Sequence, residues 1–532
     1  MSPALPAALD SQQIPNDVGS LKHLLLTRDA AYREVFTAWQ SQFESLHQQI
    51  LNLRRIQFGA SSERLAGQAE LFSESVTLPL PPTLTEKITY ERQRPGRPAL
   101  PKDLPRERVE YDLAEAEKAE FDVLTRIGEE VSETLDYTPA KLIVIEHARL
   151  KYACEKDGER TIRTAAAQPS PLPKSNASPG LLAQVIVAKY CDHVPLNRQE
   201  KIFKRHGCAI AKATLCEWSL ATAALVDVLL PPLIEHVLAA PRVHCDDTVL
   251  PLQVAGRGKT KMARLWGYLG AGERRDETGV WVHHPPAVVF EFTQSRESIH
   301  PLRFLAHYRG YLQADAYSGF DVLYRSGDII EVGCIVHLRR KFFEVAQPQK
   351  TPGLAHEALA FIAKLYEIEA AVRGQSPDEK YLKRQSEAVP LLTDFKAWLE
   401  GHYGKLLPRG PLAQAFYYAL AHWDALVRYT EHGVLEPDNN WIERALRPVA
   451  VGRHAWLFAG SERGGRAAAT FYSLIETAKL NGVEPFAYLK DVLTRLPSHP
   501  INRVAELLPF HWKAAHASDR SYIPVTENHA RA

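Results

Sequence analysis

The sequence has no excess of charge of either sign. Its 64 lysines and arginines face 63 aspartates and glutamates, which leaves a net charge of +1 across 532 residues. A chain with this balance has no global attraction to nucleic acid, so any such affinity has to come from local clusters of basic residues. Bulk charge therefore decides nothing about the partners of this protein, and local patterns have to be read instead.

Paired cysteines and long apolar runs are also missing. The six cysteines contain no CxxC pair, a usage typical of reduced thiols and not of a disulfide framework. They are Cys154, Cys191, Cys208, Cys216, Cys245 and Cys334. We find no secretory signal at the start and no apolar run long enough to cross a bilayer, so we expect a cytoplasmic protein without a membrane partner.

The chain is too long for one compact domain and indicates about three or four units. The first, residues 1–65, contains a long helix over 21–57 whose apolar residues recur in heptads, which predicts a coiled coil that self-associates. The alternative is a helix packed against its own protein. The heptad residues are Tyr32, Trp39, Leu46 and Leu53 in one seam position and Phe36, Phe43 and Ile50 in the other.

Residues 66–110 are rich in proline and polar residues and are predicted to be a linker. Its segment "RQRPGRP" places Arg94 and Arg97 on an extended, proline-stiffened arm. Such an arm fits the minor groove of DNA. The alternative is the solvated charge of an ordinary linker.

Two small units come next. Residues 111–170 are predicted to be a mixed module with strand candidates in "AKLIVIEHARLKYAC". In residues 171–237, a helix through Phe203, a turn at Gly207 and a second helix from Ala211 to about Leu220 have the spacing of a helix-turn-helix. A helical connector is the alternative. The basic surface of this unit consists of Lys204, Arg205 and Lys212, with Lys201 beside them.

From residue 238 to 475 the pattern changes to short strand-like runs. Three strands, a helix, then strand, helix, strand and helix is the order of a ribonuclease H-like α/β core with a mixed sheet. Residues 350–432 contain only helical patterns, so we predict an all-helical insertion into this core. Residues 476–532 are predicted to be a C-terminal helical tail.

Acidic residues occupy two positions on the predicted sheet. Asp246 and Asp247 lie within the first strand, and Asp315 lies at the end of the fourth. A carboxylate in the inner part of a sheet needs a cation or a metal, because its unpaired burial is unfavourable. For any one of them alone, a salt bridge or a turn cap is the alternative.

The stretch "DNNWIERALRP", residues 438–448, offers a third carboxylate. A helix capped by Asp438 or Asn439 places Glu443 at the edge of its apolar stripe, facing the strand aspartates. Oxygen ligands from two strands and one helix suit Mg²⁺ or Mn²⁺. The alternative for Glu443 is an intrahelical ion pair with Arg447.

Asparagines and arginines surround Glu443, and we predict that they support the site and contact phosphates. A following Gly-rich turn that opens a helix adds an anion site of backbone N–H groups, but no GK[ST] follows, so a nucleotide-binding loop is not indicated. The predicted DNA-contacting residues of this part are Asn439, Asn440, Arg444, Arg447, Arg453 and Arg463, with Arg339 and Arg340 from the last predicted helix of the core; His337 either faces DNA with them or has a core role.

The chain resembles the DDE transposases of the insertion sequence 66 family, specifically the large catalytic subunit. The resemblance extends over nearly the whole chain and rests on stretches that include "FGASSERL", "HCDDT", "LQADAYSGF", "CIVHLRRKFFE" and "DNNWIERALRPVAVGRHAWLFAGSERGG". It implies a ribonuclease H-like catalytic domain whose acids are Asp246, Asp315 and Glu443. With two Mg²⁺ or Mn²⁺ ions, these acids would cleave DNA and transfer the strand.

The resemblance also implies partners. The helix-turn-helix would bind terminal inverted repeats, the coiled coil would pair subunits, and target DNA and accessory proteins of the same element would complete the assembly. The protein would then be bacterial and cytoplasmic, and associated with the nucleoid when bound. A DNA-binding remnant without catalysis and a ribonuclease H-like nuclease without strand transfer are the alternatives.

One departure from the family concerns zinc. Relatives commonly carry two CxxC-type pairs near residues 111–160, whereas this chain has only Cys154 there. One thiolate does not make a tetrahedral structural zinc site. We therefore expect no structural zinc in this degenerate module.

Overall fold

The computed structural model describes residues 17–30, 33, 142–147, 151–156 and 159–164, and residues 169–516 apart from 174, 255, 257, 350 and 351. Residues 18–30 and 33 are helical. The predicted heptads from Tyr32 to Leu53 and the linker with Arg94 and Arg97 lie outside the described residues. The coiled coil and the basic arm therefore stay predictions.

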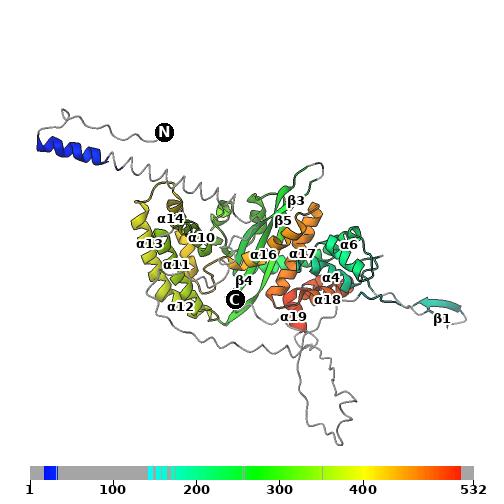
Figure 1. The fold of residues 1–532 in the computed structure, drawn as a ribbon. Helices are drawn as coiled ribbons and strands as arrows, with labels where there is room; N and C mark the ends of the chain where they lie inside the picture. Colours follow the sequence, from blue (N-terminus) through cyan, green and yellow to red (C-terminus); the bar gives the residue numbers. More distant parts are fainter. Residues whose placement is uncertain are drawn as a thin grey trace, which may run out of the picture.

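A five-stranded mixed sheet forms the centre of the molecule (Figure 1). The strands follow one another in space as β5, β4, β3, β6 and β7; the first three are antiparallel, and β3, β6 and β7 are parallel. This mixture and order are consistent with the predicted ribonuclease H-like core. The strand bounds are β3 Arg242–Leu252, β4 Lys261–Arg275, β5 Trp281–Thr293, β6 Gly310–Gln313 and β7 Ile329–Val332.

The connections within the core are helical where the sequence predicts helices. Helix α8 (Ile299–Phe304) precedes β6, the short α9 (Asp321–Tyr324) precedes β7, and α10 (Ile335–Ala346) follows it. The strand and helix order of this region is therefore confirmed.

The described segment after α10 is all-helical, as predicted, and it shares with β7 and α10 an apolar core that is separate from the main one. In Figure 1 its helices lie together beside the sheet. Arg384 is fully buried in it, where it pairs with Glu369 and donates to the backbone carbonyls of Tyr429 and Leu435. The elements are α11 Leu354–Ala371, α12 Pro377–Lys383, the π-helical η4 Arg384–Ala388, α13 Val389–Tyr403, α14 Pro411–Ala421, α15 Trp423–Val427 and η5 Arg428–Thr430.

After the insertion the chain returns to the sheet through α16 (Asn440–Trp456) and α17 (Glu462–Leu480). Helix α17 covers the edge strand β5: Val288 N donates to Thr477 Oγ1 at 3.0 Å and Phe290 N to Ser473 Oγ at 2.8 Å. These hydroxyls satisfy backbone groups that an edge strand leaves open. The remaining elements are α18 Pro485–Arg495, η6 Leu496–Ser498, η7 Ile501–Leu507 and α19 Pro509–His516.

The helices before the sheet include the predicted pair. Helix α5 (Leu196–Arg205) and α6 (Lys212–Val226) are joined by a turn in which Gly207 has φ +87°, a left-handed conformation that favours glycine. The second helix is thus longer than predicted. The other elements here are α4 Pro179–Tyr190, η2 Asp227–Leu229 and α7 Leu230–Leu238.

Two predictions about this half of the chain differ from the structure. The sequence indicated no apolar run long enough to cross a bilayer, but among the described residues one helical stretch, Lys212–Leu238, is long and apolar enough by length and composition. Leu215, Val226 and Leu233 of this stretch belong to the main apolar core, and core helices pass the same test. Of the short strand candidates predicted within residues 140–154, the described residues show one: residues 142–147 form no strand, whereas β1 (Lys151–Lys156) pairs with β2 (Glu159–Thr164) in a hairpin.

Candidate active site

The register of the sheet places Asp246 and Asp315 at the same level. Strands β3 and β6 pair in parallel up to His244 and Gln313, and each aspartate lies two residues beyond that pair. Neighbouring strands are about 4.8 Å apart, so two side chains at one level of adjacent strands come close to each other. The fold therefore brings these two acids together although 69 positions separate their numbers in the sequence.

A glycine brings α16 onto the same face of the sheet. Gly267 of β4 is the antiparallel partner of Asp246, so the two residues face the same side. A Cβ on Gly267 would lie only 2.8 Å from Cδ1 of Ile442. The missing side chain thus lets α16 approach the sheet beside Asp246, with Glu443 as the next residue on the helix.

Asn439 fixes the start of α16 against β3. Its side chain is fully buried: Nδ2 donates to the Cys245 carbonyl at 3.0 Å, and Oδ1 contacts Nδ1 of His244 at 2.9 Å. Its backbone N–H donates to Sγ of Cys334 at 3.2 Å. The prediction that Asn439 contacts DNA was therefore wrong, because burial and these hydrogen bonds commit its amide to holding the helix in place.

Burial raises the pKa of all three acids. Burial raises the pKa of Asp246 well above its usual range, and the charges of Asp315 and Glu443 raise it further. Burial raises the pKa of Glu443 to about 7, against the opposing charge of Arg340. Burial likewise raises the pKa of Asp315, which Arg296 opposes. A cation placed among these carboxylates would relieve both effects.

The neighbouring Asp247 lies on the opposite face of β3 and is neutralised by the protein. Its side chain is 2% exposed and accepts from Arg264 Nη1 at 2.9 Å and from Arg296 Nε at 2.8 Å. Arg296 also lies 3.7 Å from Asp315. The sequence alone did not separate the two adjacent aspartates, whereas these contacts identify Asp247 as the salt-bridged one of the two.

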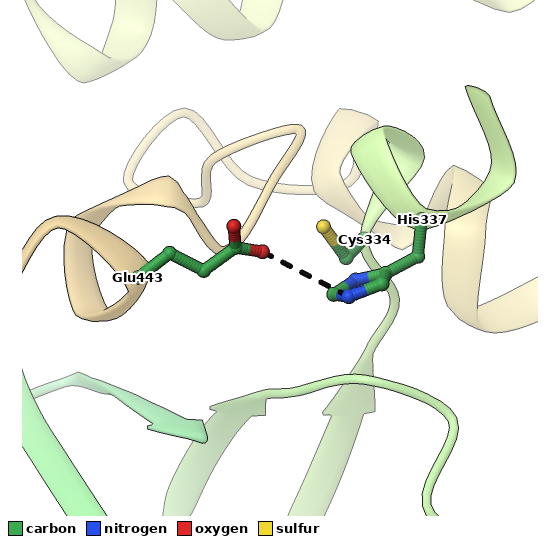
Figure 2. Close-up of side chains that lie close together, drawn as sticks. All are labelled: Cys334, His337 and Glu443. Carbon is green, nitrogen blue, oxygen red and sulfur yellow. Dashed lines mark ion pairs between the residues drawn. The ribbon is translucent and has the colours of Figure 1, made fainter. Parts of the chain in front are cut away.

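A second group of side chains meets at Glu443. Figure 2 shows Cys334, at the start of α10, and His337, in its first turn, pointing toward the Glu443 carboxylate. Nε2 of His337 lies 3.8 Å from Oε1 of Glu443, and the ligand atoms of all three residues lie within 4.8 Å of one another. Of these two partners, the sequence predicted His337 only as a DNA-facing or core residue and Cys334 only as one of six reduced thiols. Their C-x-x-H spacing at the start of a helix is the signal that indicates a shared side.

In the part of the chain that the structure describes, no other three metal-capable side chains are this compact. Asp246, Asp315 and Glu443 do not form a group within that distance. Carboxylate oxygens are the donors that Mg²⁺ and Mn²⁺ prefer, so the donor set of these three acids fits such ions.

The predicted basic residues have different environments. Nη1 of Arg453 donates to the Val249 carbonyl and lies 3.4 Å from Thr248 Oγ1, so it ties α16 to β3. Arg339 is half-buried with its guanidinium 5.6 Å from the Phe343 ring, and Arg340 and Asn440 are half-buried as well. The exposed ones are Arg444, Arg447 and Arg463 near the acids, and Lys204, Arg205 and Lys212 on α5 and α6.

The Gly-rich segment after α16 is the first turn of α17 and not a loop before it. Ser461 caps this helix and accepts from Gly464 N at 3.1 Å. A Cβ on Gly465 would lie 2.5 Å from the Phe292 ring, so this glycine serves the packing of α17 on β5.

Four family models match the chain. "Transposase IS66 family" covers residues 174–467, and "IS66 C-terminal element" covers 473–510. "Transposase C of IS166 homeodomain", a leucine-zipper model, covers 45–109, and "zinc-finger binding domain of transposase IS66" covers 119–156.

The zinc-finger match contradicts the expectation of no structural zinc, because this part of the family indicates zinc binding. That expectation counted thiolates alone. Zinc is also held by histidine nitrogen and carboxylate oxygen, and the matched segment contains His147 and several acidic residues besides Cys154.

Three curated proteins of Sinorhizobium fredii (strain NBRC 101917 / NGR234) are similar. "Uncharacterized protein y4hP" is 36% identical over 451 residues, which is 81% of this chain and 79% of that protein. "Uncharacterized protein y4jD" is 33% identical over 95% of this chain and 98% of its own length, and "Uncharacterized protein y4qI" is 32% identical over 94% and 98%. Since the transposase model alone spans more than half of the residues, this chain belongs to the Transposase IS66 family and carries its DDE transposase domain.

Proposed function

We propose that the protein binds the inverted repeats of an insertion sequence and catalyses metal-dependent cleavage and strand transfer of DNA, with Asp246, Asp315 and Glu443 as the catalytic acids. One observation carries the proposal: burial raises the pKa of all three acids, and the charges of Asp315 and Glu443 raise the pKa of Asp246 further, in a family that implies a divalent metal. Divalent ions held there would supply charge stabilisation for the attacking and leaving oxygens of the phosphate.

The chain's own residues would position the reactants. Asp246 is held within β3, Asp315 lies two residues after the end of β6, and Glu443 is held by the docking of α16 through Asn439. The exposed Arg444, Arg447 and Arg463 would contact phosphates on the approaching DNA. Because these contacts carry no base information, recognition of the repeat ends is assigned to α5 and α6, whose exposed basic residues are Lys204, Arg205 and Lys212.

The assignments of self-association and cellular location also rest on the family to which the chain belongs. The leucine-zipper model over residues 45–109 overlaps the predicted heptads, and we assign subunit pairing across two DNA ends to this region. We place the protein in the bacterial cytoplasm, where its DNA lies.

The test is a cleavage and strand-joining assay on DNA that carries the element's own ends, with Mg²⁺. Glu443→Gln keeps size and hydrogen bonding but removes the charge, so we expect cleavage to fall by about 10²- to 10³-fold or more. Glu462→Gln, an exposed glutamate on the next helix, is the matched control and should leave the rate unchanged. Full activity of Glu443→Gln would reject the assignment.

The same assay separates the alternatives. A remnant without catalysis shifts the DNA in a gel and never nicks it, and a nuclease hydrolyses the ends without joining them to a target. Either outcome in the unmodified protein would replace the proposed function.

A further inference from the structure

A thiol, an imidazole and a carboxylate converge at the start of α10, and this donor set differs from that of the three acids (Figure 2). Sulfur and imidazole nitrogen are poor ligands for Mg²⁺ but good ligands for Zn²⁺, which takes three protein ligands and an open position in many sites. Around Glu443, Mg²⁺ would therefore bind the carboxylates of Asp246 and Asp315, and Zn²⁺ would bind Cys334 and His337.

The distances already approach those of a bound ion. Typical Zn–N and Zn–O bonds of about 2.0–2.1 Å put two tetrahedral ligand atoms roughly 3.4 Å apart. Nε2 of His337 and Oε1 of Glu443 are 3.8 Å apart, and Sγ of Cys334 completes a group within 4.8 Å. Side-chain shifts of less than about 1 Å would close the site.

An unsatisfied polar atom points to a missing occupant. Oε1 of Glu443, the carboxylate oxygen that faces Nε2 of His337, is buried in the described part of the chain without a hydrogen-bond partner. Native proteins rarely leave such atoms unpaired, and an ion or water usually accounts for them.

The surroundings suit a metal thiolate. The Asn439 N–H donates to Sγ of Cys334 at 3.2 Å, and such outer hydrogen bonds stabilise a ligating sulfur. Zn²⁺ with one thiolate and one carboxylate has no net charge, so it can occupy a site where Cys334 is 1% exposed. The positive charge of Arg340 opposes a cation here, and the negative charges of Asp438 and Asp315 favour one.

We propose that Cys334, His337 and Glu443 form a Zn²⁺ site that withdraws Glu443 from Asp246 and Asp315 and so switches off the Mg²⁺-dependent reaction. Binding replaces the thiol proton, which leaves to the solvent, by the metal, and no redox step occurs. The inhibitory consequence rests on the proposed function, whereas the binding site itself does not.

The binding test uses Co²⁺ as the probe, because a cobalt–thiolate bond gives a charge-transfer absorption in the near ultraviolet. The full chain carries Cys154→Ser, which removes the thiol of the zinc-finger segment, and is freed of metal by a chelator. We expect one equivalent of Co²⁺ to produce the band, and Cys334→Ser to abolish it. Cys208→Ser, at an exposed cysteine, is the control and should retain it. A band that survives Cys334→Ser, or no band before that change, would overturn the proposal.

The activity test adds Zn²⁺ to the Mg²⁺-dependent cleavage assay. Inhibition is measured relative to each protein's own rate without Zn²⁺, and Cys334→Ser should raise the inhibitory Zn²⁺ concentration by at least about tenfold. Equal inhibition of both proteins would contradict the switch. If the protein cleaves no DNA but the cobalt band behaves as expected, the site stands and the proposed function fails.

Discussion

The two faces of the central sheet treat their carboxylates differently. On the face under α16, burial and the charges of two further acids raise the pKa of Asp246. On the face under α7 and α8, Asp247 is 2% exposed but accepts hydrogen bonds from two arginines. Asp246 and Asp247, adjacent in one strand, thus differ: arginines of the protein pair with Asp247, whereas two further acids act on Asp246.

This difference separates a structural carboxylate from a functional one. Where arginines neutralise a buried acid, removing the acid destabilises the folded protein, because the arginines lose their partner. Where buried acids lie together without enough protein cations, their repulsion lowers the stability of the folded protein, and a bound cation would relieve it. Each of the following changes tests one side of that comparison.

The largest effect is expected from Asp246→Asn. We expect DNA cleavage to fall by about 10²-fold or more, because one metal ligand is lost. Without metal, the thermal midpoint should stay or rise, because a buried repulsion disappears. Mg²⁺ should raise the midpoint of the unmodified protein but not that of the variant, which differential scanning calorimetry measures. A variant that Mg²⁺ stabilises as strongly as the parent would break the comparison.

Asp247→Asn should have the opposite profile. Removing the partner of two arginines should lower the free energy of unfolding by about 2 kcal/mol, since hydrogen bonds between charged groups contribute about this much. Urea unfolding measures it. Because this carboxylate is not assigned to the metal, Mn²⁺ binding followed by calorimetry should persist. Loss of Mn²⁺ binding with unchanged stability would exchange the roles of the two aspartates.

Gly267→Ala tests how closely α16 must approach. The new methyl group would lie 2.8 Å from Cδ1 of Ile442, and overpacking of this kind destabilises by roughly 1–3 kcal/mol. Ile442→Val removes that Cδ1, so the double variant should recover part of both stability and cleavage. If the single variant is as active and stable as the parent, the close approach is not what positions Glu443.

The smallest effect is a pH dependence on the α7 face. His284 stacks on His236 at 4.0 Å, and burial lowers its pKa to about 4. An unfolded histidine has a pKa near 6.5, so between about pH 6.5 and 4 the unfolded state binds more protons and stability falls as pH falls. Unfolding measured across this range should be less pH-dependent in His284→Gln. His283→Gln, at an exposed neighbour, is the control and should keep the slope.

The elements of the core could be predicted from sequence because their signals are local. Alternating apolar residues identified the strands, and helical spacing identified the insertion and α16. The position of Asp315 just beyond β6 followed from the same pattern. The contacts between strands could not be predicted in this way, because they depend on strand register. No local pattern indicates that Asp246 pairs with Gly267 or that Arg264 and Arg296 contact Asp247.

The environment of single side chains was harder still. The sequence indicates only that Asn439 is a polar residue at the start of a helix. In the structure its side-chain amide donates a hydrogen bond to the Cys245 carbonyl, 194 positions away in the sequence. The Cys334 thiol likewise becomes a partner of Glu443 only because α10 and α16 begin side by side. The zinc expectation was wrong because a count of cysteines does not include the nitrogen and oxygen ligands that zinc also accepts.

The most direct test of the central claim is a crystal of the full chain soaked with Mn²⁺ and measured at the manganese absorption edge. We predict anomalous peaks in contact with the carboxylates of Asp246, Asp315 and Glu443. Peaks at Asp247 instead, or none within ligand distance of the three acids, would contradict it.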